Sequence, residues 1–587
     1  MDHNGVLIVG AGPTGLTLAC DLRGRGIAVE VIDKAARPAT TSRALGLQPR
    51  GREILIRLGA LGDLPDRAVQ AYATNIRLRR KLLTKFVVQT ERDQDALGPL
   101  LISQAEIEAQ LRRRLAELGG EVHWGHEIVA AKQNGGGVET RVRTSNGEYS
   151  IRSGWLIGCD GAHSAVRGLM GVDFAGRPFP ETWILADVLL TDSRTGDEGT
   201  MWLHPDGMIG LVPLPGGVWR IFAELDRNDP IAKGGHVAAT ALRGASPVSE
   251  AVLDRVRSLM RERTGDASMR IALCLWTSVF RFHRRIASAY RRQHLLLAGD
   301  AAHIHSALGG QGMNTGIGDA FNLGWKLACV VRGGASDRLL DTYEEERRPV
   351  AADVVRKTSR AWNILVGRTV FHRLFRDHVL LPILRWPALQ RRWVETGSQL
   401  HVSYRGGPLA KTTLGERLWS FIRHAPLAGD RAPNAACRML PSGEASTLAA
   451  LTNAHWALLL FGSSLANRGA RVGAARRNLE GLRVIRVLPC GSEDGFARPL
   501  ASERLVLDDG GAIARTYRPG RHAAILLRPD GHIAWRSSRL ALDGLVAWLR
   551  RSLDANDGAP SEIVDDATAR SSPAANAPPA TEPGSNP

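Results

Sequence analysis

The N-terminal segment that ends at Asp33 constrains the fold more than any other part of this chain. An apolar run, Val6-Leu7-Ile8-Val9, leads directly into Gly10-Ala11-Gly12-Pro13-Thr14-Gly15, and a second run, Ala28-Val29-Glu30-Val31-Ile32, ends at Asp33. The apolar stretch between the two runs predicts a helix. This order of strand, glycine turn, helix, strand and acid is typical of a nucleotide-binding βαβ unit.

Each glycine has its own expected role in such a unit. Gly10 permits the tight turn, Gly12 lets a pyrophosphate approach the backbone at a helix N-terminus, and Gly15 lets the helix pack against the strand. We expect Asp33 to accept a hydrogen bond from a ribose hydroxyl. Because an acid at this place requires a free 2′-hydroxyl, the sequence predicts FAD or NAD, and not NADP, as the nucleotide.

Composition excludes several other classes of protein. The six cysteines form no CxxC pair and no Cys/His spacing, so we expect neither a disulfide framework nor a metal site, and a reducing, cytoplasmic location. No apolar run approaches the roughly 18 residues of a membrane span. The net charge of +17 would suit nucleic acid, but the 76 basic residues are spread along the chain without a nucleic-acid-binding motif. We therefore expect no nucleic acid partner.

Changes in the secondary-structure pattern along the sequence predict an α/β protein with three domains. Residues 1–175 alternate strands and helices, and residues 286–400 return to that pattern, so we expect one discontinuous domain with a parallel sheet. Residues 176–285 contain strand-like runs broken by Pro/Gly turns and predict an antiparallel sheet. A smaller α/β domain is expected over 428–555, and the Ala/Pro/Ser-rich residues 556–587 are expected to be disordered.

Two further motifs follow predicted strands. The first is Cys159-Asp160-Gly161-Ala162-His163-Ser164-Ala165-Val166-Arg167, and the second is Gly299-Asp300-Ala301-Ala302-His303, with a loop, Gly309-Gly310-Gln311-Gly312-Met313-Asn314, before a helix over about 317–331. Asp300 can accept a hydrogen bond from a sugar-chain hydroxyl, and bare amides at a helix N-terminus stabilise negative charge. The alternative for this loop is a simple helix cap with flexible glycines.

The three motifs together resemble those of the single-component FAD-dependent aromatic hydroxylases. The similarity covers about residues 5–400, and the C-terminal segment resembles the thioredoxin-like domain of the phenol, hydroxyphenylpropionate and aromatic polyketide hydroxylase branch, here without CxxC. The resemblance implies a discontinuous Rossmann-like FAD-binding domain, a substrate-binding middle domain with an antiparallel sheet, and a third domain that serves packing or oligomer contacts, with a homodimer as one arrangement.

The resemblance also assigns roles to individual residues. It implies FAD contacts at Arg43, Gln104, Asp160, Asp300, Gly312, Met313 and Asn314, in addition to Gly10, Gly12, Gly15 and Asp33, with Gly309, Gly310 and Gly312 near the flavin ring. From the residues alone, Asp160 and Arg167 fit equally well a structural ion pair that orients two elements. His303 and His305 form a His-x-His pair without a third ligand, so we expect a loop position and no metal.

One departure from the family pattern concerns the loop beside the flavin. Ala307 replaces a proline that relatives usually carry before the glycine run, so the loop is expected to be more mobile or to fit a differently shaped substrate. The chain has no second strand–glycine–helix–acid unit, so the nicotinamide nucleotide must bind transiently.

The function implied by the resemblance is hydroxylation of an aromatic substrate, phenolic or polyketide-type. FAD would be reduced by NAD(P)H, react with O₂ to a C4a-hydroperoxide and transfer one oxygen atom, so no side-chain nucleophile is expected. A base for the substrate would lie on the middle sheet, where Trp202, His204, Arg220 and Arg281 are candidates, and the alternative for each is an ordinary strand residue. Epoxidation or Baeyer–Villiger oxygenation uses the same motifs and remains open, as does a non-catalytic flavoprotein.

Overall fold

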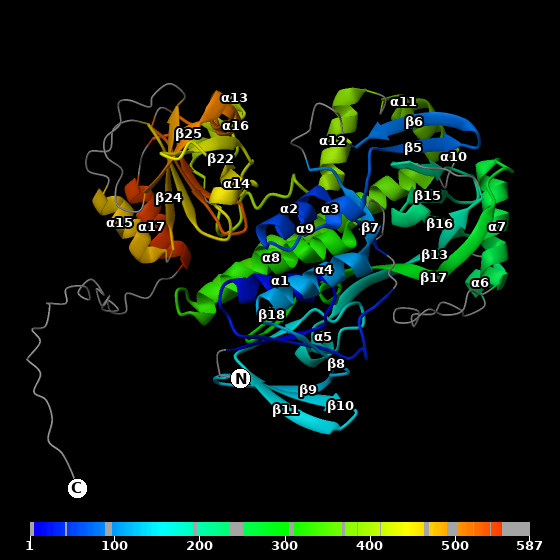
Figure 1. Ribbon diagram of the computed structural model, residues 1–587, viewed down its shortest axis with the longest axis horizontal. Helices are drawn as coiled ribbons and strands as arrows, with labels where there is room; N and C mark the ends of the chain where they lie inside the picture. The colour runs from blue at the N-terminus through cyan, green and yellow to red at the C-terminus, as the bar shows by residue number, and fades with distance from the viewer. Residues whose placement is uncertain are drawn as a thin grey trace, which may run out of the picture.

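The protein is described by a computed structural model, in which three groups of sheets and helices are distinguishable (Figure 1). It describes residues 5–40, 44–88, 97–191, 196–226, 228–233, 250–304, 310–366, 370–383, 386–410, 412–462, 469–479, 481–489, 503–520, 522–539 and 542–553. The tail predicted to be disordered, residues 556–587, lies outside these ranges.

The first domain is built on a six-stranded sheet that is parallel except at one edge. Its order is β18 (Arg291–Arg292), β19 (Leu295–Leu297), β12 (Trp155–Gly158), β1 (Val6–Val9), β2 (Val29–Asp33) and β8 (Val122–Trp124). Helices α1 (Pro13–Gly24), α4 (Gln104–Glu117) and α8 (Gly312–Val331) lie on one side, and the antiparallel strands β9 (Glu127–Asn134), β10 (Gly137–Thr144) and β11 (Gly147–Ser153) on the other (Figure 1). With both faces covered, every residue of β1 is buried.

This domain is discontinuous in sequence, as predicted. β12 pairs in parallel with β1 on one side and with β19 on the other, so the chain leaves the sheet after Gly158 and returns at Leu295. α8 begins at Gly312, earlier than the predicted start near residue 317, because the glycine loop itself supplies the first turn of the helix.

A small antiparallel sheet lies beside the first domain. It contains β3 (Leu45–Leu47), β7 (Leu100–Ser103) and β4 (Val69–Gln70), with the short helices α2 (Pro49–Arg57) and α3 (Leu64–Arg67) between them in sequence. β7 ends at Ser103, and α4 begins at the next residue, Gln104. Ser103 is its N-cap and accepts a hydrogen bond from the Glu106 amide, as the capping pattern indicates.

The middle domain is an eight-stranded sheet. Its order is β20 (His303–Ile304), β17 (Ile271–Ala287), β13 (Phe174–Leu190), β16 (Trp219–Leu225), β15 (Ile209–Pro213), β14 (Glu198–Trp202), β5 (Ala73–Leu78) and β6 (Lys81–Val87). The antiparallel prediction is right for all the pairs but one, since β14 runs parallel to β5. β5 belongs to the N-terminal segment, so no local pattern within residues 176–285 could predict that β14 pairs with it.

Helices cover the middle sheet from different sides (Figure 1). α7 (Glu250–Thr264) packs Val256 and Leu259 onto one face, and the short helix α6 (Pro230–Lys233) joins it there. α9 (Asp341–Val366) leads from the first domain to α10 (Val370–Phe375), α11 (Leu381–Ile383) and α12 (Pro387–Ser398), and the last two contact β6.

The C-terminal domain is a thioredoxin-like α/β sandwich. Its seven strands follow the order β22 (Ala445–Thr447), β21 (Ala436–Leu440), β25 (Glu503–Asp508), β24 (Arg483–Pro489), β23 (Ala457–Phe461), β26 (Ala524–Leu527) and β27 (Ile533–Ser537). Leu458 and Leu460 of β23 pack with α15 (Gly469–Asn478) and α17 (Leu542–Leu553), whereas Leu459 and Phe461 pack with α14 (Leu448–Leu451) and α16 (Ala512–Tyr517). α13 (Leu414–Arg423) precedes the sheet.

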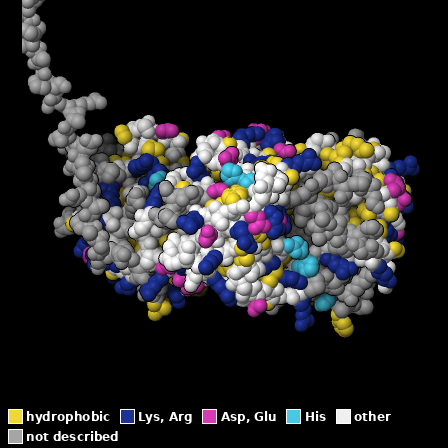
Figure 2. Space-filling model, turned by 90° about the horizontal axis from the view of Figure 1, so that it is seen from below, with side chains coloured by type: hydrophobic (Ala, Val, Ile, Leu, Met, Phe, Trp, Pro, Cys, Tyr) yellow, Lys and Arg dark blue, Asp and Glu magenta, His cyan; other side chains and the backbone are white. Residues whose placement is uncertain are grey.

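Charge on the surface is mixed. On the face seen in Figure 2, Lys and Arg side chains are dispersed and interleaved with acidic and polar groups. Among the described residues, no helix combines the length and the apolar character needed to cross a membrane.

Candidate functional site

The three glycines of the N-terminal turn have different surroundings. Gly10 adopts φ +109°, and a Cβ there would lie 2.3 Å from the Cys159 carbonyl oxygen. A Cβ on Gly15 would lie 2.0 Å from the Gly10 oxygen, so this glycine permits α1 to pack on the turn. A Cβ on Gly12 would have no atom within 4 Å. Gly12 therefore borders open space at the N-terminus of α1, where a phosphate group needs access to backbone amides.

Asp33 ends β2 and is buried. Its Oδ2 accepts from the Ala11 amide at 2.9 Å, and its Oδ1 accepts from the Ala35 amide at 2.8 Å. The carboxylate thus ties the glycine turn to the end of the neighbouring strand. Each carboxylate oxygen has a second lone pair, so the predicted ribose contact is compatible with these bonds and stays a prediction.

The glycine turn meets the Gly299-Asp300 turn at Thr14. A Cβ on Gly299 would lie 2.5 Å from Thr14 Oγ1, and a Cβ on Gly316 would lie 2.3 Å from the same atom. The two glycines also approach each other, since the Gly316 Cβ position is 3.2 Å from Gly299 Cα. The N-terminal turn, the Gly299-Asp300 turn and the start of α8 therefore converge on one point, although they are far apart in the chain.

The first turn of α8 combines bare amides with one anchoring side chain. Gly312, Met313 and Asn314 supply first-turn amides, which have no partner within the helix. The Asn314 side chain donates from Nδ2 to the carbonyls of Gly46 and Gly310 at 3.1 and 2.9 Å. This side chain therefore holds neighbouring backbone, and the amides of the turn remain for a ligand.

Asp160 caps a helix. Its oxygens accept from Ser164 Oγ at 2.5 Å and from the amides of Ala165 and Val166 at 2.7 and 3.1 Å, at the start of α5 (Ala165–Met170). Burial raises the pKa of this carboxyl above its ordinary value. An FAD contact at Asp160 stays a prediction.

Arg167 links the second and third motifs. Its Nη1 donates to the Ala301 carbonyl at 2.9 Å, and its guanidinium lies 3.8 Å from the centre of the Phe174 ring. The hydrogen bonds of Asp160 go to Ser164 and helix amides and those of Arg167 go to carbonyls, so no hydrogen bond of the described residues joins the two side chains.

The remaining predicted contacts are less well defined. Asp300 is exposed in the turn after Gly299, where it can reach a ligand. Gln104 donates from its backbone to the Ala44 carbonyl at 3.3 Å, which places it beside the residue that follows Arg43. Arg43, His305, Ala307 and Gly309 lie outside the described residues.

Sequence reasoning missed a buried polar centre behind the Gly299-Asp300 turn. Asp319 on α8 accepts from the Gly299 amide at 3.1 Å, from His303 Nε2 at 2.6 Å and from Arg347 Nε at 2.7 Å. Burial acts to raise the pKa of Asp319, but His303 and Arg347 hold it below its ordinary value. Within the described residues, no three His, Cys, Asp or Glu side chains are grouped as a metal site requires.

A signal for this centre is present in the sequence. Asp319, Asn322 and Lys326 recur at three- and four-residue spacing in an otherwise apolar helix, so they share one face. All three are buried.

The site fits FAD on its own geometry. Neither α1 nor α8 has a side-chain hydrogen bond at its N-cap, so both first turns present uncapped amides. The open space at Gly12 suits a pyrophosphate, and the α8 turn suits a flavin ring that becomes negatively charged on reduction. Gly12, Met313 and their neighbours would hold the nucleotide through backbone groups.

The middle sheet has one face rich in aromatic side chains. Trp183, Leu185, Met208, Trp276 and Phe280 form one buried cluster, to which Met201 and Phe222 add. The opposite face packs on α7. Arg220 lies on the aromatic face, where it pairs with Asp187 through two contacts of 2.7 Å.

This aromatic face contains polar atoms that no described residue satisfies. Trp276 Nε1 and Ser278 Oγ are buried and have no hydrogen-bond partner within the described chain. Glu224 shares the face, and burial raises its pKa to about 7. Buried polar atoms without partners are uncommon in native proteins, so this face has the chemistry of a site for a ligand that is both aromatic and polar.

The four residues predicted as candidate bases are divided between the faces. Trp202 packs in the cluster beneath α7. Arg281 donates to Thr182 Oγ1 at 3.0 Å and to the Ala232 carbonyl, on that same side. His204 accepts from the Asp206 amide at 3.2 Å in a turn. Of the four, only Arg220 reaches the aromatic face, and the sequence could not distinguish the faces because both are apolar.

The fold and the site define an FAD-binding flavoprotein with a separate sheet, one face of which is rich in aromatic side chains. Residues 4–358 match the family described as FAD binding domain, and residues 425–556 match the family described as aromatic-ring hydroxylase, C-terminal. The chain belongs to the FAD-dependent aromatic-ring hydroxylases and is a flavoprotein monooxygenase.

Individual relatives agree with this assignment. The chain is 34% identical over 556 residues to a 6-methylpretetramide 4-monooxygenase of Streptomyces rimosus, covering 93% of each chain. An anhydrotetracycline hydroxylase of Streptomyces rimosus superposes with a TM-score of 0.71 at 29% identity, over 94% of this chain and 99% of that one. An aklavinone-11 hydroxylase, solved with FAD and aklavinone, superposes with a TM-score of 0.73 at 25% identity over the same shares.

Proposed function

We propose that this protein uses NAD(P)H and O₂ to hydroxylate a fused-ring aromatic substrate of polyketide type. The relatives named above act on 6-methylpretetramide and anhydrotetracycline, or were solved with aklavinone. The observation that carries the proposal is the aromatic face of the middle sheet, which combines planar rings with buried polar atoms that have no partner among the described residues.

The aromatic side chains of this face suit a planar substrate. Trp183 and Phe222 have ring centres 6.4 Å apart and planes inclined by 32°. A substrate ring that makes offset contacts with these side chains would gain stabilisation beyond that from the surface area it buries. Such a surface also excludes water, which prevents side reactions at the reacting centre.

The polar atoms of the same face would orient the substrate. Trp276 Nε1 can donate to a carbonyl or phenolic oxygen, and Ser278 Oγ can donate or accept. The Arg220 guanidinium lies 5.4 Å from the Trp276 ring centre, and its ion pair with Asp187 anchors it there. Leaving these atoms unsatisfied is unfavourable, so a substrate that satisfies them is selected over one that cannot.

The first domain would hold the cofactor that supplies the oxygen-transfer chemistry. FAD, when bound, accepts a hydride and activates O₂. The first-turn amides of α8 would stabilise negative charge on the flavin ring, and Asp319 would hold the Gly299 turn through its amide. No side chain is required to attack the substrate.

The experiment is NADH and NADPH oxidation by the FAD-loaded protein, with and without a panel of simple phenols and fused-ring hydroxyaromatics. Oxidation stimulated by a fused-ring compound, with one oxygen atom added to an aromatic carbon, is the expected result. A product with an epoxide or an inserted ring oxygen would change the reaction type, and stimulation by simple phenols alone would contradict the substrate class.

Two tryptophans on opposite faces of the sheet provide a matched test of the binding face. Trp276→Phe removes an indole N–H from the aromatic face, and Trp202→Phe makes the same change beneath α7; the two residues are 3% and 5% exposed. We expect Trp276→Phe alone to raise KM about tenfold, as the loss of one ligand hydrogen bond does. Equal KM values in the two variants would exclude this face as the substrate site.

A further inference from the structure

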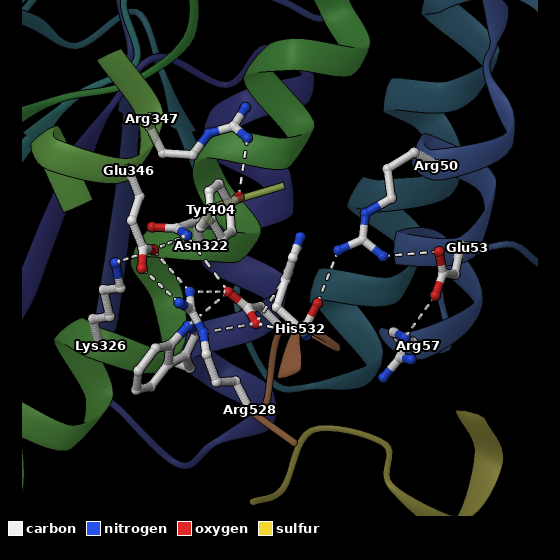
Figure 3. Close-up of polar contacts among 12 residues, drawn as sticks. Arg50, Glu53, Arg57, Asn322, Lys326, Glu346, Arg347, Tyr404, Arg528 and His532 are labelled. Atoms are coloured by element: carbon white, nitrogen blue, oxygen red, sulfur yellow. Dashed lines mark hydrogen bonds and ion pairs between the residues drawn. The ribbon is translucent and has the colours of Figure 1, made fainter. Parts of the chain in front are cut away.

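The C-terminal domain inserts one charged turn into the first domain. The RPDGH turn, Arg528-Pro529-Asp530-Gly531-His532, joins β26 to β27. Its three charged or titratable residues, Arg528, Asp530 and His532, are each only 1% exposed. Figure 3 shows Arg528 and His532 among labelled side chains of α2, α8 and α9. A turn at the end of a hairpin is ordinarily exposed, so its burial here calls for a reason.

Arg528 and Asp530 bind the two helices behind the FAD site. Arg528 donates to both oxygens of Glu346 on α9, at 2.5 and 2.8 Å. Asp530 Oδ2 accepts from Trp325 Nε1 on α8 at 3.3 Å. The Glu346 carboxylate also accepts from Lys326 Nζ at 2.8 Å, so helix α8 and the RPDGH turn share it (Figure 3).

The same turn contacts α2. Arg50 Nη2 donates to the Asp530 carbonyl at 2.8 Å, and Arg50 Nη1 donates to Glu53 at the same distance. α2 begins immediately after Gln48, whose amide donates to Asn314 in the first turn of α8. The RPDGH turn therefore reaches the start of α8 through α2.

A second route passes through Tyr404. Its ring centre lies 4.3 Å from that of His532, and its hydroxyl accepts from Arg347 Nη1 at 3.1 Å (Figure 3). Arg347 in turn donates to Asp319 and, through Nη2, to the Thr315 carbonyl at 3.0 Å. Asp319 binds the Gly299 amide. Only two side chains, Arg347 and Asp319, separate Tyr404 from the Gly299-Asp300 turn.

The segment that precedes the C-terminal domain adds another contact with the start of α8. Gln399, at φ +59°, donates from Nε2 to the Gln311 carbonyl at 3.3 Å and to Thr315 Oγ1 at 3.0 Å. Tyr404 itself is held to the C-terminal domain, because its amide donates to the Gly429 carbonyl at 2.8 Å. The first turn of α8 is thus bound by Gln399, in the segment between α12 and the C-terminal domain.

We propose that the RPDGH turn and Tyr404 position the first turn of α8, so that the C-terminal domain is a positioning element of the FAD site. The inference rests on FAD binding and not on the identity of the substrate. Buried ion pairs contribute little net stability, but they permit few alternative arrangements. A dense set of such pairs behind a cofactor helix therefore specifies its geometry.

The test compares two variants that each remove one phenolic oxygen. Tyr404→Phe breaks the bond from Arg347, whereas Tyr517→Phe breaks a bond of 2.7 Å to the Pro433 carbonyl within the C-terminal domain. Both tyrosines are buried and keep their rings. Hydrogen exchange of the amides of residues 315–319 is measured in the FAD-free protein, and the Kd for FAD is measured by flavin fluorescence.

We expect faster exchange at residues 315–319 and about fivefold weaker FAD binding in Tyr404→Phe alone, the change in Kd that one lost hydrogen bond produces. Arg50→Lys, which keeps the charge but loses the bond to the Asp530 carbonyl, should act in the same direction. Equal exchange and equal Kd values in Tyr404→Phe and Tyr517→Phe would overturn the proposal. If the parent protein binds FAD but hydroxylates no aromatic compound, the proposed function fails, whereas this inference is decided by the FAD Kd and exchange values alone.

Discussion

Asn314 and Gln48 are joined by a hydrogen bond of 2.9 Å, in which the Gln48 amide donates to Asn314 Oδ1. They lie 266 positions apart in the chain. With the bonds from Asn314 Nδ2 to Gly46 and Gly310, this side chain connects the loop before α2 to the first turn of α8. One amide group thus fixes two backbone segments that border the FAD site.

Replacement of this side chain should weaken FAD binding without unfolding the protein. We expect Asn314→Ala to raise the Kd for FAD about tenfold, because the segments on either side of the helix turn lose a shared anchor. The control is Asn478→Ala, which removes a bond of 2.7 Å to the Ala474 carbonyl on α15. A Kd in Asn314→Ala no higher than in this control, measured by flavin fluorescence, would contradict the anchoring role.

The glycines of the N-terminal turn should separate cofactor binding from folding. Gly12→Ala places its Cβ in open space, so we expect an unchanged Tm for the FAD-free protein and an FAD Kd raised at least about tenfold. Gly15→Ala drives its Cβ against the Gly10 oxygen at 2.0 Å, and we expect a lower Tm or no folded protein. Normal FAD affinity in Gly12→Ala would exclude a phosphate beside this residue.

The two partners in the Lys326–Glu346 pair should differ in their effect on stability. Burial acts to raise the pKa of Glu346, but Arg528 and Lys326 lower it to about 2, whereas burial lowers the pKa of Lys326 to about 8. Glu346→Gln leaves two buried cations without their shared carboxylate, and we expect a loss of about 3–5 kcal/mol. Lys326→Met leaves Glu346 paired with Arg528, so a smaller loss is expected. Urea unfolding followed by tryptophan fluorescence measures both, and equal losses would contradict this division.

Glu224 should make stability depend on pH. Burial raises its pKa from 4.5 to about 7 in the folded protein, so folding favours the protonated form. The stability that the protonated Glu224 carboxyl gives the folded protein is fully present below about pH 4.5 and is lost as the pH rises through about 7. This pH-dependent part of the free energy of unfolding amounts to at most about 3 kcal/mol. We expect Glu224→Gln to be more stable than the parent at pH 8 and equal to it near pH 4.5. Identical urea midpoints for the parent and Glu224→Gln at pH 8 would show that ionising Glu224 does not destabilise the folded protein.

Much of the fold could be predicted from local patterns. The glycine turn, the Ser103 cap of α4 and the apolar strand before Gly299 depend on contacts within a few residues, so the sequence expresses them directly. The family resemblance extended these patterns to an FAD-binding monooxygenase, which the comparisons confirm. The residues predicted to contact FAD remain predictions, but the structure brings Gly12, Gly299 and the first turn of α8 to one place.

The sequence by itself determined the class of protein and the positions of the three motifs that carry its family resemblance. Only the tertiary structure decided that β5 joins the middle sheet in parallel, that Trp276 and Trp202 lie on opposite faces, and that Asp160 caps a helix. It also decided that Arg528 and Glu346, 182 positions apart, share one buried cluster. The physical reason is that a buried polar group takes whichever partner the packed domains bring within hydrogen-bond distance, and that partner leaves no trace in the neighbouring sequence.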